Sequence, residues 1–179
     1  SRIARLAWSP DGKWLASTCG AHGSVSLWSV AEAKRGPTLE TNQNIQIAWS
    51  PDSRHLLVAG WWNLLMFDVR TGKPVAPFEK NVKPQIRQLA WSSDNRWFAT
   101  VGRDADAIQV WNPASGEKGP TLEGTRATGA GFYTRLLAFS PDGRRLASEA
   151  SKTEVRIIDV DSKNALKIPI APGKTTEVA

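Results

Sequence analysis

Cys19 and His22 lie three residues apart, so a thiol and an imidazole are close enough in sequence to act as nucleophile and base. The chain has one cysteine and two histidines, the second being His55, which we expect on the surface of a strand. No third group is placed to orient the imidazole, and no nucleophile motif surrounds the thiol. We therefore predict no catalytic residue, no cofactor and no enzymatic activity.

Asp104 and Asp106 are one residue apart and could contribute oxygens to a cation site. Calcium requires six to eight oxygen ligands, and no further carboxylate follows in a ligand-loop spacing, so we predict a polar hairpin loop without metal. The glycine-containing stretch 124–134 lacks the Lys-Ser or Lys-Thr and the following helix of a phosphate-binding loop. We interpret it as a loop insertion.

The composition limits other classes of function. One cysteine excludes an intrachain disulfide framework or four-cysteine metal site and favours a reducing compartment. No stretch approaches eighteen apolar residues and the N-terminus lacks a signal-peptide pattern, so we expect a soluble, cytoplasmic protein with no membrane partner. The formal charge of +6 permits anionic partners, but the basic residues are scattered singly, as on an ordinary solvated surface.

An aromatic residue recurs in a repeated segment, which identifies the elements that must position any site. The segment reads Leu-Ala-Trp-Ser-Pro-Asp-Gly at 6–12, and it returns with small changes at 47–53, 89–95 and 137–143. Its aromatic falls at positions 8, 49, 91 and 139, at intervals of 41, 42 and 48 residues. This period is typical of propeller blades and longer than that of ankyrin or tetratricopeptide arrays.

Within each repeat the apolar spacing is that of strands. A first strand ends at the aromatic, and a second follows a turn, as at 14–17 and 97–100. Third strands are expected at 25–30, 64–69, 108–112 and 155–160, and weaker fourth strands near 37–40, 74–78, 119–123 and 165–168. In the first strand Leu6 and Trp8 point to one side and Ala7 to the other, so both faces are apolar. A sheet packed between two neighbouring blades requires such faces.

The turn after each first strand has residues suited to a tight hairpin. Proline sets the second backbone angle, aspartate bonds its own backbone, and glycine supplies a left-handed exit at positions 12 and 143. We expect Asn95 to adopt that exit readily, and Ser53 less readily.

The third strands end in Trp28-Ser29, Phe67-Asp68, Trp111-Asn112 and Ile158-Asp159. At this slot the chain resembles the WD40-repeat family, in which Trp-Asp stands there. The resemblance covers essentially the whole chain. It implies an all-β fold of four WD40-like propeller blades, each a four-stranded antiparallel sheet, forming a partial ring or part of a larger ring of one or two chains. The repeat positions that it marks are Trp8, Trp28, Trp49, Phe67, Trp91, Trp111, Phe139, Asp11, Asp52, Asp94 and Asp142.

The TolB-like propellers are the alternative, because their units also resemble Trp-Ser-Pro-Asp-Gly. The segments 70–73 and 114–117, Arg-Thr-Gly-Lys and Ala-Ser-Gly-Glu, follow Trp-Asp-like endings and favour WD40. Gly-Pro-Thr-Leu-Glu at 36–40 and 119–123 is similar to the linking strand of bacterial WD40 arrays.

The family's Gly-His pair is missing from every repeat, so its buried Asp-His-Ser/Thr-Trp network is not transferred. Ser17, Thr100 and Ser148 match its hydroxyl position, and Trp28 and Trp111 its indole. A reduced hydroxyl-to-indole bond is therefore expected in the first and third repeats. Val58 and Phe67 exclude it in the second.

We expect one propeller segment over 1–179, with repeats at about 3–44, 45–85, 86–134 and 135–174 and the start of a fifth at 175–179. An open stack would leave apolar sheet faces in water. Either the chain is part of a longer array, or identical chains complete the ring, and two chains would give eight blades.

The predicted function is a non-catalytic scaffold for a protein or peptide. Its partner site is expected in the loops between second and third strands and in the loops that enter each blade, which share one face. The candidate residues are Trp61, Trp62, Lys83, Arg103, Arg126, Phe132 and Tyr133. The alternatives are a polyanion- or nucleic-acid-binding propeller, which the scattered charges disfavour, and a regulatory segment of a larger signalling enzyme.

Overall fold

The computed structural model describes residues 3–19, 24–41, 44–60, 63–75, 86–102, 107–123, 136–151 and 154–169. Within these ranges every helix or strand assigned is a strand. The described part of the chain has no helix long and apolar enough to cross a membrane.

The described strands form four antiparallel sheets that follow one another along the chain. The first sheet contains β1 (Ile3–Trp8), β2 (Trp14–Cys19), β3 (Ser24–Ser29) and β4 (Lys34–Glu40). The second contains β5 (Asn44–Trp49), β6 (His55–Gly60) and β7 (Leu64–Asp68). The third contains β8 (Ile86–Trp91), β9 (Phe98–Gly102), β10 (Ala107–Trp111) and β11 (Lys118–Glu123). The fourth contains β12 (Leu137–Phe139), β13 (Arg145–Ser151), β14 (Glu154–Asp159) and β15 (Ala165–Pro169).

Three of these sheets have four strands and the second has three. In the second sheet Pro74 forms an isolated antiparallel bridge to Phe67, at the place where the other sheets have their fourth strand. The residues that follow, 76–85, lie outside the described part of the chain.

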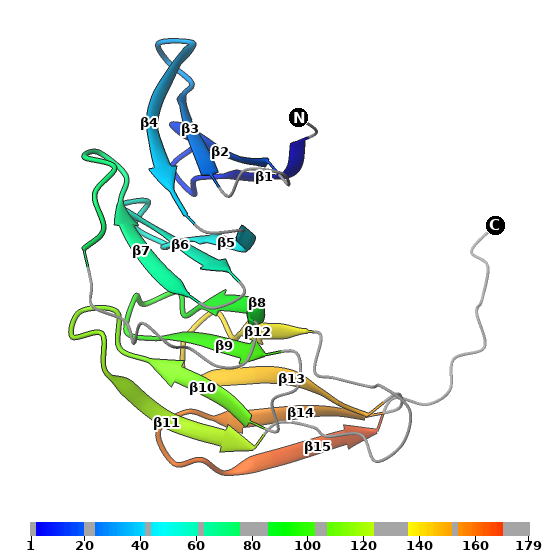
Figure 1. The fold of residues 1–179 in the computed structure, drawn as a ribbon. Coiled ribbons are helices and arrows are strands. Elements are labelled where there is room, and N and C mark those ends of the chain that lie inside the picture. Colours follow the sequence, from blue (N-terminus) through cyan, green and yellow to red (C-terminus); the bar gives the residue numbers. More distant parts are fainter. Residues whose placement is uncertain are drawn as a thin grey trace, which may run out of the picture.

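The four sheets are stacked in chain order, from the first in blue to the fourth in orange and red (Figure 1). The first strands of consecutive sheets, β1, β5, β8 and β12, contact one another and form one edge of the stack. Successive strands of each sheet then run outward from that edge. This is the arrangement of propeller blades, and it confirms the all-β propeller prediction.

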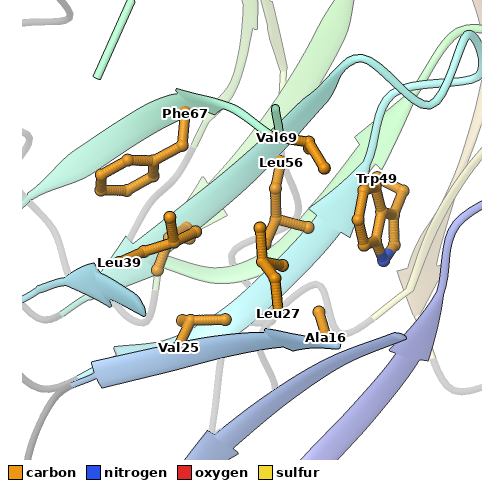
Figure 2. Close-up of a cluster of buried hydrophobic side chains, with 9 residues drawn as sticks. Ala16, Val25, Leu27, Leu39, Trp49, Leu56, Phe67 and Val69 are labelled. Atoms are coloured by element: carbon orange, nitrogen blue, oxygen red, sulfur yellow. The ribbon is translucent and has the colours of Figure 1, made fainter. Parts of the chain in front are cut away.

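Apolar side chains from facing sheets form the core. Figure 2 shows the cluster between the first and second sheets, in which Leu27 and Leu39 of the first approach Leu56 and Phe67 of the second. Two further clusters join the second sheet to the third and the third to the fourth.

The second sheet shows why both of its faces had to be apolar. Leu56 and Val58 pack toward the first sheet, whereas Leu57 and Ala59 pack toward the third. Neighbouring residues of one strand point to opposite faces, so an uninterrupted apolar run fills two interfaces at once.

The repeated tryptophan also carries a polar contact between sheets. Trp49 Nε1 donates to the carbonyl of Ala7 at 3.0 Å, and Trp91 Nε1 donates to the carbonyl of Ala48 at 3.3 Å. Phe139 occupies this slot in the fourth sheet and has no N–H to donate. These bonds therefore hold the first strands of the first three sheets in the same register.

The turns after the first strands adopt the left-handed conformation predicted for them. The φ angles are +70° at Gly12, +62° at Ser53, +59° at Asn95 and +71° at Gly143. Turns of neighbouring sheets also touch, because the N–H of Asp11 donates to Ser53 Oγ at 3.0 Å. We call this side of the stack, with the β3–β4 type turns that share it, the turn face.

Candidate functional site

All seven residues predicted to bind a partner lie outside the described residues: Trp61, Trp62, Lys83, Arg103, Arg126, Phe132 and Tyr133. So do His22, Asp104, Asp106 and the stretch 124–135, and of Cys19 only the backbone, in β2, is described. Among the described residues no three histidine, cysteine, aspartate or glutamate side chains come together as metal ligands would.

The strand ends on either side of residues 61–62 and 103–106 are described. β6 ends at Gly60 and β7 begins at Leu64, while β9 ends at Gly102 and β10 begins at Ala107. In an antiparallel hairpin these ends lie opposite the turns at the other end of the strands. We call this side of the stack the loop face.

On the turn face each Ser-Asp pair closes its own hairpin. In the third sheet Ser92 Oγ donates to Asp94 Oδ1 at 2.6 Å and accepts from the N–H of Trp97 at 2.9 Å. The N–H of Arg96 donates to the same carboxylate oxygen at 3.0 Å. The first, second and fourth sheets repeat these bonds.

These bonds stabilise the ionised carboxylates. The Ser9 hydroxyl and the Lys13 N–H lower the pKa of Asp11 below its ordinary value. At Asp94 burial acts in the opposite direction, but the bonds from Ser92 and Arg96 outweigh it and the pKa is again lowered. The carboxylates therefore act as fixed acceptors within their turns.

The aspartates of the Trp-Asp-like endings accept hydrogen bonds within the turns that follow the third strands. Asp68 Oδ1 accepts from the N–H and the hydroxyl of Thr71 at 2.7 and 2.8 Å, and these bonds lower its pKa. Asp159 is held in the same way by Ser162. Gly72 follows with a φ of +67°, so the aspartate of this motif has a structural role.

The reduced network predicted for the first and third repeats is present. Trp28 Nε1 donates to Ser17 Oγ at 2.8 Å, and Trp111 Nε1 donates to Thr100 Oγ1 at 2.9 Å. The first bond lies on an exposed face and the second is buried. The difference arises because the third sheet has a neighbour on that face.

One packing contact was missed by the sequence interpretation. The Trp97 indole lies against Gly119, where a Cβ would come within 2.7 Å of the ring, and Trp14 lies in the same way against Gly36. Tryptophan and Gly-Pro occur together in the first and third repeats, whereas His55 and Arg145 fill the tryptophan slot in the other two, which lack Gly-Pro. That co-occurrence was the signal for the contact.

The outer face of the first sheet is apolar and uncovered. Trp8 is 59% exposed, although Trp49 in the same slot of the second sheet is 8% exposed. Trp28 is 40% exposed, against 1% for Trp111 in its slot of the third sheet.

The outer face of the fourth sheet is also uncovered. Ile168 is 41% exposed, whereas Leu39 and Leu122, which pair with their third strands at the same register, are buried. Leu166 is exposed as well. Both ends of the stack therefore carry faces that are core in the interior sheets.

A cavity of about 290 Å³ lies on the turn face between the first and second sheets. Its lining residues are Trp14, Ser53, Arg54, Asp68, Val69 and Arg70. The cavity combines two guanidinium groups, one carboxylate and an indole.

Comparison with known families agrees with this architecture. The family model described as "WD domain, G-beta repeat" matches residues 1–29 and 72–112. A solved chain described as Kuenenia stuttgartiensis Hydrazine Synthase has a TM-score of 0.74 and 20% identity, over 92% of this chain and 48% of its own. That likeness concerns the fold.

Among curated proteins, the B-type cell cycle switch protein ccs52B of Medicago truncatula is 30% identical, over 98% of this chain and 35% of its own length. The Arabidopsis thaliana Protein FIZZY-RELATED 3 is 27% identical, over 87% of this chain and 31% of its own. Human Apoptotic protease-activating factor 1 is 24% identical, over 83% of this chain and 13% of its own. The chain thus spans about a third or less of these relatives.

Proposed function

The chain belongs to the WD40-repeat β-propeller family, and from this premise we propose that it is a non-catalytic scaffold binding a protein or peptide on its loop face. One observation carries the proposal. In every described sheet the Ser-Asp pair of the turn bonds within its own hairpin and has a structural role, whereas the opposite ends of the strands adjoin the segments that differ most between repeats.

The proposed anchors are the seven residues predicted from the sequence, with Trp61, Trp62 and Arg103 as the principal ones. Tryptophan and arginine are the side chains most enriched at binding hot spots, where each contributes on the order of 2 kcal/mol. Two indoles adjacent in sequence, with cations in the next repeat, suit a peptide or protein surface.

Single alanine variants test this site. Trp61→Ala, Trp62→Ala and Arg103→Ala should each weaken capture of the native partner from a lysate while leaving the melting temperature unchanged. Arg144→Ala, an exposed arginine on the turn face, is the matched control. Normal capture by all three loop variants would show that the partner does not use the loop face.

A salt titration distinguishes polyanion binding, the alternative function, from binding of a protein or peptide. Contacts to phosphates release counterions, so such affinity falls steeply as salt rises. For a protein or peptide partner we propose that the affinity depends only weakly on salt.

We also propose the cytoplasm as the compartment, on the basis of the single cysteine.

We further propose that a second copy of this chain covers the two outer faces and closes a ring of eight blades. The outer face of the first sheet carries bulky Trp8 and Trp28, and the outer face of the fourth carries small and aliphatic slots such as Ala147 and Ile168. Inside the stack, bulky side chains of one sheet pack against small and aliphatic side chains of the preceding sheet. Trp49 of the second sheet, for example, is in the same cluster as Ala16 and Leu27 of the first. Head-to-tail contacts of this type close into a ring when the rotation permits.

A further inference from the structure

The cavity between the first and second sheets can be compared with the same place in another pair of sheets. Between the third and fourth sheets the same slots hold Trp97, Arg144, Asp159 and Val160. Two slots differ: Gly143 replaces Ser53, and Asp161 replaces Arg70. Ser53 Oγ accepts the N–H of Asp11 from the neighbouring turn. Serine and glycine are both uncharged, so only the difference at Arg70 alters the charge of the site.

Between the third and fourth sheets an ion pair joins the two sheets. Arg96 pairs with Asp161 across the two sheets at 3.5 Å, and its guanidinium carbon lies 5.9 Å from the centre of the Trp97 ring. The cation thus lies over the indole and meets a carboxylate from the next sheet.

Between the first and second sheets this pairing cannot form. Lys13 occupies the slot of Arg96 and pairs with Asp11 of its own turn at 3.7 Å. Arg70 stands where the carboxylate would be, and like charges do not pair. Among the residues that the structure describes, neither Arg54 nor Arg70 forms a salt bridge.

The local charge changes accordingly. The six lining slots hold two arginines and one aspartate between the first two sheets, a formal charge of +1. The same slots hold one arginine and two aspartates between the last two sheets, a formal charge of −1. Asp68 also lines the first site, and its pKa is lowered by the bonds from Thr71 and, to a lesser extent, by the charge of Arg70. The two arginines outnumber this single carboxylate.

We propose that this cavity binds an anionic side chain of a partner peptide, a carboxylate or a phosphate, with Arg54 and Arg70 on the anion and Trp14 against the neighbouring apolar atoms. Guanidinium groups suit both anions, because their N–H donors match the spacing of the two oxygens. A volume of about 290 Å³ is close to the lower limit of small-molecule pockets and suits one or two side chains. The inference rests on the scaffold function but concerns the turn face.

Fluorescence anisotropy with three labelled peptides tests it. The probes are Gly-Leu-Glu-Leu-Gly, the same peptide with phosphoserine in place of glutamate, and a neutral peptide with glutamine there. The 179-residue chain should bind at least one anionic peptide about tenfold more tightly than the neutral one. Comparison of the two anionic peptides identifies the anion. Equal binding of all three peptides would overturn the proposal.

Substitutions locate the binding. Arg70→Asp places a carboxylate where Asp161 stands in the last pair of sheets, and it should reduce anionic binding about tenfold or more. Arg144→Ala, at the slot of Arg54 in the other pair, should leave it unchanged. Asp161→Arg should create a second site and raise the stoichiometry from one peptide per chain to two.

Unchanged binding in Arg70→Asp, with its melting temperature intact, would overturn the assignment. That failure is distinguishable from failure of the scaffold function, because capture through the loop face depends on Trp61, Trp62 and Arg103 and does not involve this cavity.

Discussion

Each serine of the Ser-Pro-Asp turns accepts a backbone N–H from the start of the next strand and donates to the aspartate two residues on. The aspartate in turn accepts a backbone N–H, so two side chains, the serine and the aspartate, fix the hairpin without help from the core. A polar side chain that satisfies backbone donors in this way can be buried at little cost, as Ser92 is.

These turns make stability depend on pH. The pKa of Asp94 is lowered in the folded protein, so its carboxylate stabilises the fold above the ordinary aspartate pKa of about 3.9, and that contribution is lost as the pH falls through the lower folded value. Asp94→Asn should melt below the parent near about pH 6, and the difference should narrow near about pH 3, in thermal melts followed by circular dichroism. A difference that stays constant with pH would contradict this account of the turn.

The two hydroxyl-to-indole bonds provide a matched pair. Thr100→Val keeps the side-chain shape but removes the acceptor of a buried indole N–H, so it should lower the free energy of unfolding by about 1–3 kcal/mol. Ser17→Ala removes the bond to the partly exposed Trp28, where water replaces the acceptor, and should cost less than about 0.5 kcal/mol. Equal losses of unfolding free energy, measured by urea denaturation, would show that burial does not determine how much this bond stabilises the fold.

At the scale of the element, packing against a neighbouring sheet determines how much a side chain contributes to the free energy of unfolding. Trp49→Ala removes a core indole that also donates to Ala7, and should cost about 3–5 kcal/mol. Trp8 has the same register in the first sheet but is 59% exposed, so Trp8→Ala should cost the isolated chain far less, about 1 kcal/mol at most. A Trp49→Ala variant that melts within a degree of the parent would contradict the strand register.

The contact between Trp97 and Gly119 gives a test within one sheet. Gly119→Ala places a methyl group against the ring and should destabilise by about 1–3 kcal/mol. Trp97→Arg introduces the residue type of the fourth repeat, and in that background Gly119→Ala should cost less. Additive losses in a double-mutant cycle would show that the ring does not set the requirement for glycine.

The sequence was sufficient for the strands and turns because their signals are local. Alternation in Ile-Ala-Trp, and glycine or asparagine at the left-handed position, depend on neighbouring residues only. The fourth strands of the third and fourth sheets, β11 and β15, match the expected ranges within one residue, whereas β4 begins at Lys34 rather than near Pro37. Its first residues are exposed and carry no apolar signal.

The cavity beside Trp14 could not be predicted in this way. Its lining comes from two sheets, so no single segment contains it. The scattered single cations noted in the sequence include Arg54 and Arg70, which the pairing of β6 with β7 brings together and the stacking of the sheets places beside Trp14. The partner residues expected in the loops remain a prediction.

For the whole molecule, the same interface is used between all neighbouring sheets, and the outer faces of the first and fourth sheets have the composition of its two halves. Ile168 is exposed at a position that is buried in the first and third sheets, and Trp8 is 59% exposed at a position that is buried or half-buried in the three following sheets. In the two-chain ring that we propose, these two outer faces would contact each other.

Light scattering after size exclusion measures this directly. The chain has a mass of 19.6 kDa, so the two-chain ring predicts a single species at twice that value. Trp8→Glu, which places a charge in the proposed contact, should shift that species toward one chain while its circular dichroism spectrum stays that of strands. A well-behaved parent chain that elutes with the mass of one copy at every concentration tested would contradict the ring.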